Sequence, residues 1–139
     1  MNTPGALLPG LKGQVEIVVG EEHTAPHVGS GRVHVLATPV MVNLMEAAAL
    51  QAVEGLLAAG QQTVGTHLDI THTAATPVGM RVRATAELTG VEKNRLTFSI
   101  YAEDAHERIG AGIHERIIIN LARFDERMQE KMRLIPRSA

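Results

Sequence analysis

Hydroxyl, carboxylate and imidazole groups occur together in two neighbouring segments of the sequence. The segment TPVMVNLMEAAALQAV, residues 38–53, carries Thr38 and Glu46, and the segment GTHLDITHTAAT, residues 65–76, carries His72. A carboxylate can attack a carbonyl carbon or deprotonate water, a hydroxyl can orient a carbonyl group, and an imidazole can orient the carboxylate or move a proton. These side chains predict a hydrolytic site if the two segments face each other.

Glu46 is the single charged residue of the apolar segment 38–53. Burial of a lone carboxylate is strongly unfavourable, so this side chain needs a partner or access to a ligand. No lysine or arginine lies between Arg32 and Arg81. We therefore predict that Glu46 is satisfied by His72 and a bound substrate, and that its partner is not a basic residue.

A long helix is predicted from Thr38 to about Ala59. Threonine is a favoured N-cap, Pro39 suits the first helical position, and Gly60 marks the end. The helix has little polar surface, so we expect other elements to surround it. The free backbone NH groups at its start, together with the Thr38 hydroxyl, are expected to hold an oxyanion.

Strands are predicted before and after this helix. Residues 21–37 are expected to form a loop with an extended stretch over residues 33–36, and its histidines are expected to be solvated. Alternating apolar and polar residues separated by short turns predict successive antiparallel strands. The predicted strands cover residues 13–19, 63–76, 80–92, 95–104 and 108–121.

Strict alternation along residues 65–76 determines which side chains should face the helix. It places His72 on the face of Leu68 and Ile70, which is expected to contact the helix, and Gly65 on the opposite face. His67 also falls on that opposite face, so His67 and His72 cannot bind one metal ion. No metal site is predicted.

The order of elements is typical of an α+β protein with the hotdog fold. One strand is followed by the long helix, four antiparallel strands and a charged amphipathic helix over residues 122–133, which is expected to be a solvated surface element. A hotdog fold has a long central helix wrapped by a curved five-stranded antiparallel sheet. We expect residues 1–139 to form one such domain.

The composition argues against several classes of protein. The chain has 13 Lys and Arg against 15 Asp and Glu, with 2% aromatic residues and no Trp, which does not favour a nucleic-acid partner. It has no Cys, so disulfides and thiolate metal ligands are excluded, and a reducing compartment is favoured. Neither a signal peptide nor a membrane span is predicted, so we expect a soluble cytoplasmic protein with no membrane partner.

Three motifs carry a resemblance to a known family. The segments VLATPVMVNLMEAA, VGTHLDITHTAATPVG and IGAGIHER resemble the fluoroacetyl-CoA thioesterase family of hotdog enzymes. The resemblance implies that Thr38, Glu46 and His72 are catalytic and that Gly65 and Arg116 contact the substrate. It also implies a homodimer with sites at the subunit interface and coenzyme A as the leaving group; no cofactor is expected beyond the acyl-CoA substrate itself.

The sequence defines the acyl group of the substrate and the oligomeric state less closely than it defines the reaction. The fluoroacetyl-specific enzyme carries aromatic lid residues before its helix, whereas residues 23–37 contain none here. We therefore expect a small or medium acyl-CoA and do not transfer the fluorinated substrate. The alternatives are a non-catalytic acyl-CoA-binding protein and a hotdog enoyl-CoA hydratase. Pairing of dimers into tetramers stays open, as does the choice between nucleophile and general base for Glu46.

Overall fold

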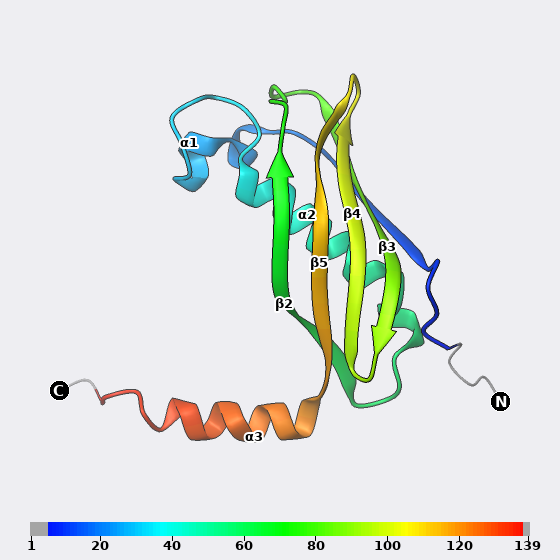
Figure 1. Ribbon diagram of the computed structural model, residues 1–139. Helices are drawn as coiled ribbons and strands as arrows, with labels where there is room; N and C mark the ends of the chain where they lie inside the picture. The colour runs from blue at the N-terminus through cyan, green and yellow to red at the C-terminus, as the bar shows by residue number, and fades with distance from the viewer. Residues whose placement is uncertain (1–5, 138–139) are drawn as a thin grey trace.

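Five antiparallel strands form one curved sheet in the computed structural model, which describes residues 6–137 (Figure 1). Their order across the sheet is β1-β3-β4-β5-β2, so the first and second strands of the chain lie at its two edges. The element order agrees with the order predicted from the sequence. The strands are β1 (Lys12–Val18), β2 (Gln61–His72), β3 (Arg81–Glu92), β4 (Arg95–Asp104) and β5 (Arg108–Asn120).

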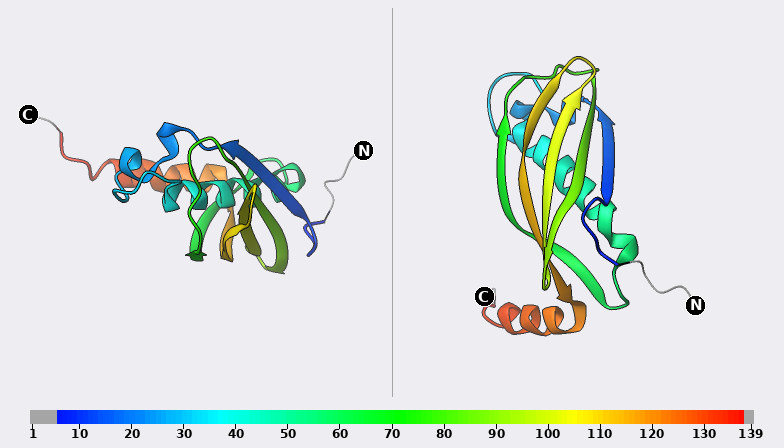
Figure 2. Two further views of the ribbon diagram at one scale, coloured as in Figure 1. Left: turned by 90° about the horizontal axis from the view of Figure 1, so that it is seen from above. Right: turned by 45° about the vertical axis from the view of Figure 1, so that its right-hand side comes forward.

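Helix α2 (Thr38–Val53) lies against one face of this sheet (Figures 1 and 2). Its buried side chains recur at intervals of three and four residues, which is one helical face. The opposite face carries exposed Asn43 and Gln51. The expectation that the helix is surrounded was wrong for the single chain, because one five-stranded sheet covers only one side. The buried residues of α2 are Met41, Leu44, Met45, Ala48, Ala49, Ala52 and Val53.

The two ends of α2 differ from the predicted ends. The N-cap is Ala37, which is buried and whose NH donates to the His23 carbonyl, so Thr38 is the first helical residue. At the other end α2 stops at Val53 and continues as the short 3-10 helix η2 (Glu54–Leu56). The prediction of Thr38 as N-cap was wrong by one residue, and its hydroxyl is therefore available to another partner.

The segment before α2 is more ordered than the predicted loop. It contains the 3-10 helix η1 (Glu21–His23) and the one-turn helix α1 (Ala25–Val28), which ends at Gly29 in the left-handed conformation. The predicted extended stretch over residues 33–36 forms only an isolated bridge between Thr24 and Leu36. These short elements lie beside the start of α2, where Thr38 and Pro39 stay exposed.

The amphipathic helix α3 (Leu121–Met132) follows β5 directly and has no buried residue. Its exposure agrees with the predicted surface helix. Figures 1 and 2 show that α3 extends beyond the edge formed by β2. None of the helices within residues 6–137 is long and apolar enough to cross a membrane.

Candidate active site

Thr38 and His72 meet where α2 begins and β2 ends. The Thr38 Oγ1 lies 2.7 Å from the His72 Nδ1, a short hydrogen bond between the hydroxyl and the imidazole. The other ring nitrogen, Nε2, is closed off from solvent and has no hydrogen-bond partner among the described residues. A buried polar atom without a partner is unfavourable, so this nitrogen is suited to meet a bound molecule or a second chain.

Burial lowers the pKa of His72 below its usual value of 6.5. The imidazole is therefore neutral at pH 7, with one nitrogen able to donate and the other able to accept a proton. If the hydroxyl of Thr38 donates to Nδ1, then Nε2 carries the proton; in the other tautomer Nε2 is a free base. Either tautomer gives the pair one group that can exchange a proton with a ligand.

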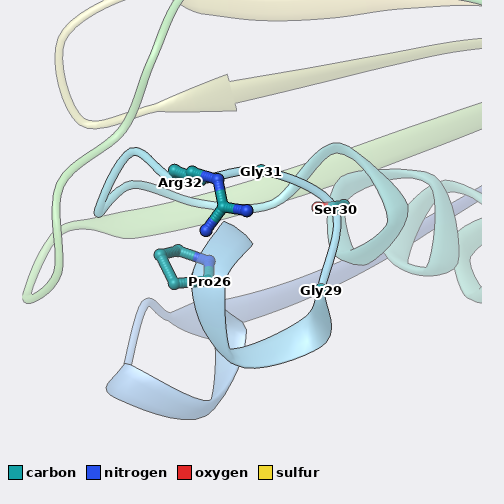
Figure 3. Close-up of a pocket in the computed structure, with 5 residues that line it drawn as sticks. All are labelled: Pro26, Gly29, Ser30, Gly31 and Arg32. Carbon is teal, nitrogen blue, oxygen red and sulfur yellow. The ribbon is translucent and has the colours of Figure 1, made fainter.

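A cavity of about 330 Å³ opens beside this pair. Arg32 stands among its polar lining residues, and the apolar ones are small or aliphatic. A neighbouring cavity of about 590 Å³ shares Arg32 and its loop with the first. Figure 3 shows the Arg32 side chain beside Pro26, with residues 29–31 forming the adjoining loop. The apolar and small residues of the first cavity are Ala25, Gly31, Val33, Val35, Leu36, Ala74 and Ala75.

Glu46 lies away from this pair and interacts with Arg116 of β5. The Arg116 Nη1 is 3.7 Å from the Glu46 Oε2, and only 9% of the arginine side chain is exposed against 37% of the glutamate. Within one chain, the prediction that Glu46 pairs with His72 and with no basic residue was therefore wrong. A sheet can supply a partner from a strand 70 positions further along the chain, which inspection of neighbouring sequence does not reveal.

The guanidinium of Arg116 is held by residues on both sides. Its Nε donates to the Thr63 hydroxyl at 2.9 Å and one Nη donates to the Thr63 carbonyl at 3.2 Å. The other Nη donates to the His114 Nε2 at 3.2 Å. Arg116 is thus fixed within the fold and orients the carboxylate of Glu46, whereas Thr63 and His114 had not been assigned to the site.

His114 is fully buried and neutral. Its Nδ1 donates to the His67 carbonyl at 2.8 Å, so its Nε2 must accept from Arg116. Burial lowers the pKa of His114, and the neighbouring charge of Arg116 lowers it further. A protonated His114 would turn an NH toward the guanidinium, so the neutral form is the one that holds Arg116.

A β-bulge at Thr66 brings Gly65 to the same site. Gly65 pairs with Arg116 and His67 pairs with Glu115, so Thr66 has no partner in the register. The extra residue turns Gly65 onto the face of Leu68 and His72, which corrects the faces predicted from strict alternation. A Cβ atom at Gly65 would lie 2.9 Å from the Glu46 Oε2, so this position allows the carboxylate to approach the strand.

The chain therefore carries two separate groups of predicted site residues. Thr38 and His72 line one cavity, whereas Glu46 and Gly65 line another of about 270 Å³, and the two cavities share no residue. Thr38 and Glu46 are eight positions apart on the helix, which corresponds to about 12 Å along the axis. No cluster of three or more potential metal ligands is present in residues 6–137.

Comparison with known proteins identifies the family. A family model described as fluoroacetyl-CoA-specific thioesterase matches residues 19–122 of this chain. The chain belongs to this family. It is therefore a thioester hydrolase, and the resemblance seen in the sequence motifs is confirmed.

Individual relatives of this thioesterase are known from sequence and from solved structures. The fluoroacetyl-CoA thioesterase of Streptantibioticus cattleyicolor is 44% identical over 97 residues, which are 70% of each chain. A solved structure of the fluoroacetyl-CoA thioesterase FlK matches with a TM-score of 0.86 and 36% identity, over 91% of this chain and 98% of its own. A thioesterase superfamily member from Thermus thermophilus matches with a TM-score of 0.84 and 30% identity, over 94% and 98% of the two chains.

The fold is also shared with a more distant protein. A hot-dog-like protein from Thermanaerovibrio acidaminovorans is 22% identical and has a TM-score of 0.82, over 93% of this chain and 94% of its own. The predicted α+β hotdog fold is confirmed.

Buried His114 and half-buried His72 predict how the stability of this thioesterase depends on pH. Burial lowers the folded-state pKa of His114 and of His72 below the usual 6.5. As the pH falls through about 6.5 the unfolded chain binds protons that the folded chain does not, so the free energy of unfolding decreases until the folded pKa values are passed. Each histidine contributes at most about 1.4 kcal/mol per pH unit.

Urea unfolding between about pH 5 and pH 8 measures this dependence. The His114→Asn variant retains an NH donor toward the His67 carbonyl and is expected to show a shallower decrease on acidification. His27→Asn, at an exposed position of α1, is the matched control and should keep the wild-type slope. An unchanged slope in His114→Asn would contradict the assignment of a neutral, buried His114.

Proposed function

We propose that this thioesterase hydrolyses a small or medium acyl-CoA to the free acid and coenzyme A, with Thr38, Glu46 and His72 as catalytic residues. The observation that carries the proposal is the Thr38–His72 pair beside an aliphatic cavity, with an unpartnered Nε2 on the imidazole. A carboxylate held by a buried arginine completes the set of groups that thioester hydrolysis requires.

We propose further that each site combines two subunits of a homodimer. The outer edge of β2 has no partner strand among the described residues, and an exposed edge of 12 residues favours pairing with another strand. A two-fold axis perpendicular to the sheet pairs two copies of β2 in antiparallel orientation. The register assigned here places His72 of one strand opposite Gly65 of the other, so that the two separate groups come together across the interface.

In the proposed reaction the carboxylate of Glu46 provides the base or the nucleophile. In the first route Glu46 takes a proton from water, the hydroxide oxygen bonds to the carbonyl carbon, and the carbonyl electrons move onto oxygen. In the second route a Glu46 oxygen bonds to that carbon and water later cleaves the anhydride. In both routes the C–S bond breaks and sulfur leaves as a thiolate, which a pKa near 8.5 makes a ready leaving group.

The start of α2 stabilises the oxyanion in this proposal with fewer donors than the sequence implied. Pro39 has no NH, and the NH groups of Val40 and Met41 donate to the Ala37 carbonyl. The NH and hydroxyl of Thr38 are therefore the donors assigned to the oxyanion, which requires the His72 tautomer whose Nδ1–H donates to the Thr38 Oγ1 and leaves the hydroxyl proton free. One such donor contributes about 3 to 4 kcal/mol to the transition state.

The acyl group is proposed from the cavity beside Thr38. Its lining is small and aliphatic, and the segment 23–37 has no aromatic residue. Solved structures of FlK variants contain acetyl-CoA, or fluoroacetate and CoA. By similarity we assign an acyl-CoA to the present site, with a small or medium acyl group in the aliphatic cavity.

Release of free thiol across a panel of acyl-CoAs, from acetyl to long chains and including fluoroacetyl, tests this proposal. We expect turnover to be highest for small or medium acyl groups. Tight binding without thiol release would instead support a non-catalytic acyl-CoA-binding protein. Loss of the crotonyl-CoA absorbance without thiol release would support a hydratase. Absence of thiol release from every member of the panel would refute the proposed reaction.

A further inference from the structure

An apolar stripe runs along α3 and is only partly covered by the rest of the chain. Positions 121, 124, 128 and 132 follow one another at helical spacing and carry Leu, Phe, Met and Met. Of these, Met132 is 56% exposed, and the residues just beyond the helix, Leu134 and Ile135, are 80% and 67% exposed. The opposite face carries Glu126 and Glu130, so the helix has one surface that favours a partner.

The position of α3 limits what that partner can be. The NH of Leu121 donates to the Gly60 carbonyl, so α3 starts beside the first residues of β2. Figures 1 and 2 show α3 running outward past the β2 edge, and the left view of Figure 2 places it on the side of the sheet that carries α2 and α1. A strand partner that joins the free β2 edge must therefore lie next to α3.

A second copy of the chain would place its own α1 at this location. A two-fold axis perpendicular to the sheet keeps both sets of helices on one side and reverses the direction of β2. The amino end of one β2, with its α3, then lies near the carboxyl end of the other β2. The segment from α1 to residue 36 lies at that carboxyl end and carries exposed Val28 and Val33.

We propose that the apolar stripe of α3 packs on the segment Ala25–Leu36 of a second copy and closes the mouth of its Thr38–His72 cavity. The segment lacks the aromatic residues that could cover the cavity from within its own chain. The C-terminal helix thus acts in trans as a lid, and the cavity is incomplete in the isolated chain. This inference rests on the homodimer of the proposed function.

Crosslinking tests the contact without any substrate. The chain has no cysteine, so the Val33→Cys/Met132→Cys variant contains only the two introduced thiols. Figure 1 places the α1 segment and α3 at opposite ends of the folded subunit. A bismaleimide can therefore join a thiol in the α1 segment to a thiol in α3 only between two subunits. We expect a covalent dimer from this variant, and none from Val33→Cys or Met132→Cys alone.

The control is Val18→Cys/Met132→Cys. Val18 is 53% exposed and lies on β1, the edge opposite to β2, so this pair should not crosslink. Light scattering reports the size of the untreated proteins. A dimer in which the Val33 pair does not crosslink would overturn the lid contact alone, whereas a monomer would overturn the dimer as well. Absence of thiol release by the wild type would reject the proposed reaction and leave the crosslinking result valid.

Kinetics provide the second readout. We expect Met128→Ala/Met132→Ala to raise KM for the preferred acyl-CoA by about tenfold, because an uncovered cavity leaves apolar groups of the substrate in water. The control variant Glu126→Ala/Glu130→Ala also introduces two alanines, but on the opposite face of α3. It should keep the wild-type KM. Equal KM values for the two variants would contradict the lid.

Discussion

Replacement of Glu46 by glutamine is expected to lower kcat for thiol release by about 10²- to 10⁴-fold. Glutamine retains the size of the side chain but can neither deprotonate water nor attack as a carboxylate, so both proposed routes are removed together. The ion pair with Arg116 is also lost, while the hydrogen bonds of Arg116 to Thr63 and His114 remain. Thiol release at saturating acyl-CoA measures the effect.

Two controls separate a chemical defect from a folding defect. Glu54→Gln changes an exposed glutamate just beyond the end of α2 and is expected to retain wild-type activity. The thermal unfolding midpoint of Glu46→Gln shows whether the fold survives. If the folded Glu46→Gln variant released thiol at the wild-type rate, a catalytic role for this carboxylate would be excluded.

Mixing two inactive variants is expected to restore activity if the site combines two subunits. In a heterodimer of Glu46→Gln and His72→Ala, one site receives an intact Thr38 and His72 from the first chain and an intact Glu46 from the second. The other site carries both defects. Random reassortment makes about half of the dimers heterodimeric, so about a quarter of the wild-type activity should return.

The matched control mixes Thr38→Ala with His72→Ala. These two residues form one hydrogen-bonded pair within a chain, so every site of their heterodimer keeps one defect in that pair. No recovery is expected beyond the activity of the separate variants. Absence of recovery in the Glu46→Gln and His72→Ala mixture, with subunit exchange verified, would place the complete site within one subunit.

The helix and strands could be predicted because local chemistry dictates them. Pro39 and the apolar run after it favour a helix, and the alternation of Val82, Ala84 and Ala86 with polar residues favours a strand with one buried face. Errors arose where long-range contacts override a local preference. Ala37 is fixed by the His23 carbonyl, and this contact moves the start of α2 by one residue.

Long-range contacts also limited what the sequence could predict about the candidate site. Gly65 inside a strand pattern is a signal for a bulge or a close approach, and it could have indicated that strict alternation fails there. The partner of Glu46 had no such signal, because Arg116 comes from a strand that only the sheet order places beside β2. Thr63, which also holds Arg116, comes from another strand and was not identifiable from spacing, whereas strand alternation does place His114 on the same face as Arg116.

The sequence by itself determined the fold and the family, because hydrophobic periodicity and the three motifs are properties of neighbouring residues. It also singled out Thr38, Glu46 and His72 as candidate catalytic residues, a role that stays a prediction. Only the tertiary structure decided that Thr38 bonds to His72 while Glu46 pairs with Arg116 in a separate cavity. The pairing of strands that are distant in the sequence, and the bulge at Thr66, determine these contacts. The periodic pattern along a single strand reveals neither the pairing nor the bulge.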